Sequence, residues 1–124
     1  MVDLELDDKY IARVIGLVTE SPMASDFDEL LAAYGVLGFY EAQMLRMADG
    51  AEDQRKLQEA KVLLAKKAED PKMTAASLDA HATVATFPAR KAETRARGDW
   101  RSMSNLRESV EQCINGIKWA SKNT

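Results

Sequence analysis

The fold is decided by the stretch from Ala85 to Ala120, which reads ATFPARKAETRARGDWRSMSNLRESVEQCINGIKWA. Eleven positions in it recur at alternating spacings of four and three residues, the heptad repeat of a helix that packs lengthwise on another helix. All but Asp99 are apolar: Ala85, Ala89, Ala92, Ala96, Asp99, Met103, Leu106, Val110, Cys113, Ile117 and Ala120. Alanine fills the first half and larger side chains fill the second. We therefore expect close helix contact in the first half and a wider core in the second.

An earlier run carries a similar repeat. Its seam positions are Leu30, Ala33, Leu37, Tyr40, Met44, Met47, Ala51 and Gln54. One step out of that frame, the seam continues with Leu57, Ala60, Leu64 and Ala68. Such a shift indicates either a stutter in a continuous helix or a break near Asp49-Gly50. We favour one continuous helix.

Helix boundaries follow from capping residues and prolines. Asp7 and Thr74 are acceptor side chains before periodic segments, and Asp26 with Glu29 has the form of a capping box. Proline punctuates the chain at Ser21-Pro22, Asp70-Pro71 and Phe87-Pro88. The predicted helices span residues 7–20, 27–68, 74–84 and 88–121.

These elements predict an all-α fold in a single helical domain, residues 1–124. The two long helices form an elongated antiparallel helical hairpin, a coiled coil, and the N-terminal helix packs at one end. Residues 85–96 would face residues 57–68 as a two-helix stalk. Residues 103–120 would face residues 30–47 in a three-helix bundle.

Composition excludes several classes of protein. A hydrophobic fraction of 46% with 30% charged residues is that of a folded chain. One Cys and one His cannot form a disulfide or a usual zinc site, so we expect no metal and no cofactor. The acidic start and the lack of a long apolar run predict neither a secretory signal nor a membrane span, which favours the cytoplasm.

The net charge of −3 conceals a basic segment. Cations gather around Trp100, a composition that can contact phosphates and stack on an unpaired base. They are Arg90, Lys91, Arg95, Arg97 and Arg101. The alternative is that they form the charged outer face of a coiled coil and that Trp100 flanks the seam.

The sequence offers little for catalysis. His81 has no carboxylate on its own helix face, since Asp79 is only two positions away. Cys113 occupies a seam position, where it is expected to be a small buried hydrophobe. Gly35 and Gly38 lie in an apolar run and favour close helix contact over anion binding. We therefore expect no enzyme activity and no small-molecule substrate.

Trp119 falls on the side of the last helix away from the seam. An indole on an otherwise polar face marks an interaction surface. Self-association or docking of the N-terminal helix would cover it.

The chain resembles certain small helical-hairpin proteins of tailed bacteriophages over residues 30–121. The resemblance lies in the residue pattern of four segments: Glu41-Ala42-Gln43, the run from Lys56 to Ala65, the Thr74 turn and the segment from Asn105 to Glu111. It implies a phage accessory protein that acts in the host cytoplasm and is encoded near recombination genes. The expected function is a non-enzymatic helical scaffold or protein-interaction module that self-associates. The alternative is a nucleic-acid-binding accessory of phage recombination or replication that uses the basic 90–101 segment.

Overall fold

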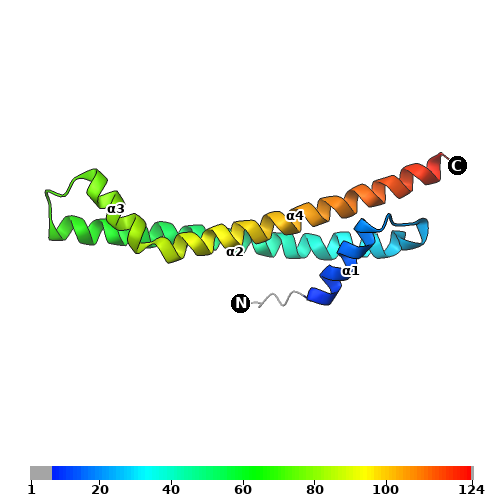
Figure 1. Cartoon of the computed structure of the whole chain (residues 1–124), viewed down its shortest axis with the longest axis horizontal. Helices are drawn as coiled ribbons and strands as arrows, with labels where there is room; N and C mark the ends of the chain where they lie inside the picture. Colours follow the sequence, from blue (N-terminus) through cyan, green and yellow to red (C-terminus); the bar gives the residue numbers. More distant parts are fainter. Residues whose placement is uncertain (1–6, 124) are drawn as a thin grey trace. The chain divides into compact units, whose positions relative to one another are not determined.

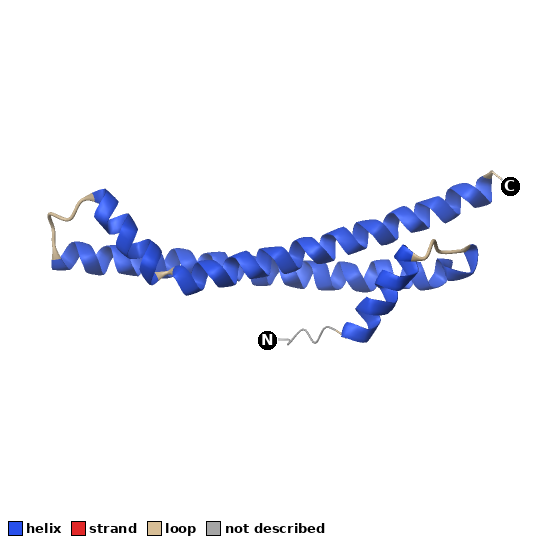
Figure 2. Ribbon diagram, viewed as in Figure 1, coloured by secondary structure: helices blue, strands red, loops and turns tan. Residues whose placement is uncertain are grey.

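The computed structural model describes residues 7–123, and all regular structure in this range is helical (Figure 2). The elements are α1 (Asp8–Thr19), a 3-10 helix η1 (Ala24–Asp26), α2 (Phe27–Glu69), α3 (Ala75–Ala85) and α4 (Phe87–Lys122) (Figure 1). Each α-helix begins and ends within one residue of its predicted bounds. The all-α prediction is confirmed, and α2 continues without a break through Asp49 and Gly50.

Side chains cap two helices as the sequence predicts. The Asp7 carboxylate accepts hydrogen bonds from the backbone N–H groups of Lys9 at 3.1 Å and Tyr10 at 3.3 Å. The Thr74 hydroxyl accepts one from the N–H of Ser77 at 3.2 Å. These bonds satisfy N–H groups that have no partner inside the first turn of a helix, which is why the predicted starts hold.

The predicted capping box at the start of α2 is wrong. Asp26 is the last residue of η1, and its carboxylate accepts from the backbone N–H of Met23 at 2.9 Å. Glu29 instead accepts from Arg13 of α1, with Nη2 and Oε2 3.1 Å apart. The chain enters α2 directly from the 3-10 helix, so the Asp26 carboxylate bonds within that turn and does not cap α2. Glu29 instead connects α2 to α1 through Arg13.

Helix α1 ends as the Ser21-Pro22 pair predicts. The N–H of Glu20 makes the last helical bond, to the Gly16 carbonyl at 3.0 Å. Ser21 then adopts a φ of 58°, a left-handed conformation that costs a non-glycine residue about 1 kcal/mol. Pro22 follows at once and cannot continue the helix.

The chain divides into two compact units. Unit 1 comprises the residues up to Gln43 together with those from Trp100 onward, and unit 2 is Met44–Asp99. Each long helix contributes one part to each unit.

Unit 1 packs three helical segments around a small apolar core. Its core side chains are at most 6% exposed: Val14, Leu30, Ala33, Leu37, Met103, Val110 and Ile114. The segments of α2 and α4 are antiparallel, because Arg107 pairs with Glu41 whereas Ile114, further along α4, lines a hollow with Leu31. Burial of Val14 confirms that the N-terminal helix packs here.

Unit 2 is also built on an antiparallel helix pair. Arg90 of α4 pairs with Glu59 of α2, and Arg97, two turns later, pairs with Glu52. The antiparallel arrangement is as expected, but these pairs set residues 90–97 opposite residues 52–59, closer to the start of α2 than the predicted 57–68. A third helix, α3, adds the buried Ala82, so this unit is more than the predicted two-helix stalk.

In unit 2, the predicted seam of α2 is correct at Met44 and Ala51 but wrong at its other positions. Met47, Leu57 and Leu64 are exposed. The positions that turn inward include Met44, Ala48, Ala51, Arg55, Glu59, Val62 and Lys66. These repeat every eleven residues, close to the natural period of an α-helix, whereas the heptad frame drifts from that period by about 20° per repeat.

The predicted alanine seam of α4 is displaced in the same unit. Ala85 and Ala92 are exposed, while Thr86 and Glu93, each one residue later, are covered. Asp99 and, in unit 1, Ala120 are exposed too. Burying an alanine gains little free energy because its side chain is a single methyl group. Longer side chains that cover the interface with their stems and pair at their tips fill the inward positions instead.

Candidate interaction surfaces

Two of the arginines predicted to bind nucleic acid are engaged inside the chain. The guanidinium of Arg97 contacts Asp49 at 2.9 Å and Glu52 at 3.1 Å, both on α2. Arg90 pairs with Glu59 at 3.3 Å and donates through Nε to the Thr86 hydroxyl at 3.1 Å. These cations already have carboxylate partners, so phosphate would have to compete for them.

Arg55 extends this charged contact across the helix pair of unit 2. It bonds Glu59 on its own helix at 3.0 Å and Glu93 on α4. The hydrogen bond to Glu93 is the main cause that raises the pKa of Arg55. With Arg90, these residues form a four-membered charge cluster, Arg55, Glu59, Arg90 and Glu93, which sequence reasoning missed. Its only sequence signal is the presence of opposite charges at helical spacings on both helices.

The other residues of the basic segment differ in how exposed they are. Lys91, Arg95 and Arg101 are exposed. Trp100 is partly covered, and its indole Nε1 is buried with no hydrogen-bond partner among the described residues. A stacking platform for bases needs an open aromatic face. The covered Trp100 instead fits the alternative reading, in which it flanks the helix contact.

Arg107 forms a contact within unit 1 that the sequence did not suggest. Its guanidinium lies over the Tyr34 ring, 4.1 Å from the ring centre, and bonds Glu41 at 3.4 Å. Gly38 permits this position, because a Cβ there would lie 3.0 Å from the Arg107 guanidinium, whereas a Cβ at Gly35 would meet nothing within 4 Å. Close contact was predicted at both glycines and is found at Gly38 alone.

A pair of matched substitutions tests this contact. Gly38→Leu and Gly35→Leu gain the same helix propensity, so their difference isolates the displacement of Arg107. We expect Gly38→Leu to be less stable than Gly35→Leu by about 1 kcal/mol, because the Arg107 guanidinium at the end of its flexible side chain moves aside and loses its contact with the Tyr34 ring. Urea unfolding followed by circular dichroism measures both. Equal stabilities would contradict the proposed role of Gly38.

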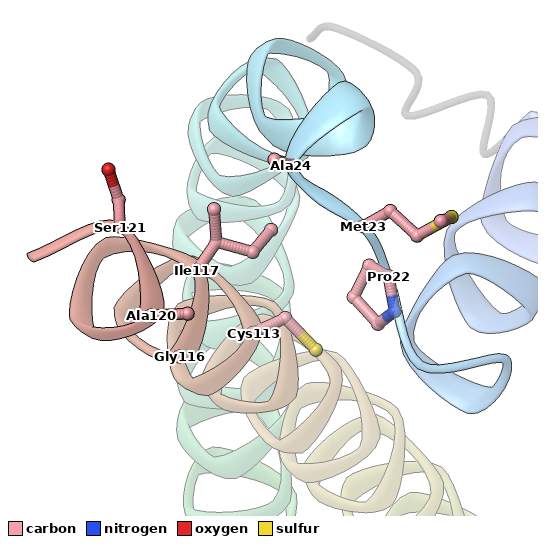
Figure 3. Close-up of a pocket in the computed structure, with 8 residues that line it drawn as sticks. All are labelled: Pro22, Met23, Ala24, Cys113, Gly116, Ile117, Ala120 and Ser121. Atoms are coloured by element: carbon pink, nitrogen blue, oxygen red, sulfur yellow. The ribbon is translucent and has the colours of Figure 1, made fainter. Parts of the chain in front are cut away.

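An open apolar groove of about 640 Å³ lies in unit 1, between the link after α1 and the last turns of α4 (Figure 3). Pro22, Met23 and Ala24 form one wall. The other wall consists of Cys113, Gly116, Ile117, Ala120 and Ser121. Cys113 is half-buried there, and desolvation raises the pKa of its thiol. A raised pKa keeps the sulfur as the less reactive thiol, in keeping with the packing role predicted for Cys113.

Trp119 lies on the outside of α4 and is 69% exposed. The N-terminal helix therefore does not cover it, although the sequence left that arrangement open. Of the two explanations offered for this indole, contact with another molecule is the one that the fold leaves available.

His81 is exposed on α3. Within residues 7–123, no cluster of three or more His, Cys, Asp or Glu side chains is placed to hold a metal ion. No helix in the same range is long and apolar enough to cross a membrane. Comparison with protein-family models, curated proteins and solved structures yields no match.

Proposed function

We propose that this protein is a non-enzymatic helical interaction module that associates with copies of itself. The phage accessory role implied by the sequence resemblance is part of this proposal. One observation carries it, namely that both units leave large apolar side chains uncovered. Unit 1 exposes Met23 and Trp119, and unit 2 exposes Leu64 and Val84, all by 69% or more. Contiguous apolar surface is typical of protein-interaction sites, and in unit 1 the open apolar groove that Met23 lines is such a surface.

The charge distribution supports protein contact over nucleic acid. Binding to nucleic acid draws its affinity from cations that release counterions at phosphates. Arg90 and Arg97 are held by carboxylates of α2, which removes two cations from the predicted surface. Nucleic-acid binding is therefore the less favoured function.

Sedimentation equilibrium over a range from low to high micromolar protein tests the proposal. We expect the average mass to rise above the 13.8 kDa of one chain as concentration increases. A mass that stays at one chain throughout would contradict self-association. In parallel, fluorescence anisotropy with labelled single-stranded and duplex DNA is expected to show no binding at low salt, and binding lost on Arg95→Ala would favour the nucleic-acid function instead.

A further inference from the structure

The exposed face of α4 near its C-terminal end carries a nearly symmetric charge pattern, in which the inner acid lies four residues before Asn115 and the inner base three residues after it. Glu108, Glu111, Asn115, Lys118 and Lys122 succeed one another at spacings of three and four residues, so they share one face of the helix. All five side chains are exposed. The outermost acid and the outermost base each lie seven residues from Asn115, with one further acid and one further base between. The pattern is acidic before Asn115 and basic after it.

Within residues 7–123, the four charged side chains of this stripe have no ion-pair partner, although arginines elsewhere on α4 do. The helix dipole favours Lys118 and Lys122 near the C-terminal end of α4. It gives no reason for the two glutamates on the same stripe. Carboxylates and ammonium groups are thus left available to a partner.

Apolar surface lies on both sides of the stripe. On one side is Trp119, which stands beside Asn115 one turn further along the helix. On the other side is a hollow of about 180 Å³ that is bordered by Glu111, Asn115 and Lys118 and lined by Leu31 of α2. Leu31 is 44% exposed at this hollow. A partner that covers the stripe therefore also buries apolar side chains, which supply most of the free energy of association.

We propose that a second copy of this chain binds this face of α4, with the two helices antiparallel and centred on Asn115. This inference rests on the proposed self-association and names its surface. Antiparallel pairing brings Lys122 of each copy opposite Glu108 of the other, and it brings Lys118 to within one residue of Glu111. Parallel pairing would place each of these charges beside its own like charge, which is unfavourable.

Asn115 at the centre of the stripe and Trp119 at its side are also compatible with antiparallel pairing. The two Asn115 amides meet on the symmetry axis, where each can donate to and accept from the other. Trp119 of each copy reaches the level of Glu111 on the other copy, next to the Lys118 of its own helix that pairs with that glutamate. Because Glu111 is exposed and pairs with Lys118 in this arrangement, the indole does not leave a carboxylate without a partner.

Charge reversal in two complementary variants tests the pairing. Glu108→Lys with Glu111→Lys makes the stripe basic throughout, and Lys118→Glu with Lys122→Glu makes it acidic throughout. In sedimentation experiments we expect each variant alone to associate at least ~10-fold more weakly than the wild-type chain, because like charges then meet. An equimolar mixture of the two is expected to recover association to within ~3-fold of wild type. Rescue in the mixture also shows that both variants are folded.

Two matched controls separate the surface from general effects. Asp53→Lys with Asp79→Lys changes the net charge by the same amount as Glu108→Lys with Glu111→Lys, but at exposed positions of unit 2. This control variant should leave association unchanged. Trp119→Ser should weaken association, whereas Phe87→Ser, at a similarly exposed aromatic of unit 2, should not. A wild-type chain that remains monomeric overturns both this pairing and the proposed function. A wild-type oligomer that withstands both charge reversals, or a mixture no tighter than either variant alone, overturns the pairing only.

Discussion

Leu37→Ala is expected to destabilise the protein by about 2–5 kcal/mol, the range for removing a fully buried leucine side chain. Leu37 is 0% exposed in the core of unit 1, between α2 and α4. The substitution removes the apolar contacts and leaves a cavity that closely packed helices cannot collapse to fill. Urea unfolding followed by circular dichroism measures the loss.

Leu64→Ala is the matched control for this change. It removes the same atoms from the same helix, but Leu64 is 73% exposed in unit 2. Its expected effect is within about 0.5 kcal/mol, as for most surface substitutions. If both variants lost the same stability, the inward face of α2 would be assigned wrongly, and the heptad frame that places Leu64 in the seam would regain support.

Thr86→Val is expected to cost about 1–3 kcal/mol, although valine has nearly the same shape. Thr86 is 0% exposed at the junction of α3 and α4. Its hydroxyl donates to the Ala82 carbonyl at 2.6 Å and accepts from Nε of Arg90 at 3.1 Å. Valine fills the space but can form neither bond. Arg90, which is part-buried, then loses this acceptor and keeps only its pairing with Glu59.

Two further substitutions distinguish the hydroxyl from the packing at this junction. Thr83→Val makes the same chemical change at an exposed position of α3 and should be nearly neutral. Thr86→Ser keeps the hydroxyl and removes one methyl group, with an expected cost of about 1 kcal/mol. Thermal or urea unfolding ranks the three variants. A Thr86→Val protein as stable as wild type would show that the two hydrogen bonds do not hold the junction.

The charge cluster of unit 2 has a consequence for how the helices recognise each other. Apolar side chains tolerate several registers, whereas Arg55 and Glu93 meet only when α2 and α4 are aligned as observed. Glu59, shared between Arg55 and Arg90, links the same alignment to a second pair. These contacts explain why a segment rich in alanine and charge forms a defined helix pair.

The candidate surfaces were only partly predictable. Trp119 was placed on the outer side of its helix from heptad position alone, and it is exposed. The basic segment was recognised by composition, which cannot show that Arg90 and Arg97 meet carboxylates on α2, because those carboxylates lie about 31 to 48 residues away along the chain. The nearly symmetric stripe around Asn115 is visible in the sequence. Its significance depends on the structure, which shows that its charges are exposed and unpaired within the described chain.

The sequence by itself determined where the helices begin and end. Acceptors such as Asp7 and Thr74, together with the three prolines, act within one turn of the backbone, so their effect can be read locally. Only the tertiary structure decided which face of each long helix turns inward. A heptad repeat and an eleven-residue repeat differ by only a fraction of a residue per helical turn, so the sequence pattern does not distinguish them. Arg and Glu side chains can either cover an interface or face solvent, so their positions do not identify the outer face. That choice depends on the opposite helix, and it places Arg97 inside the helix pair and leaves Leu64 outside.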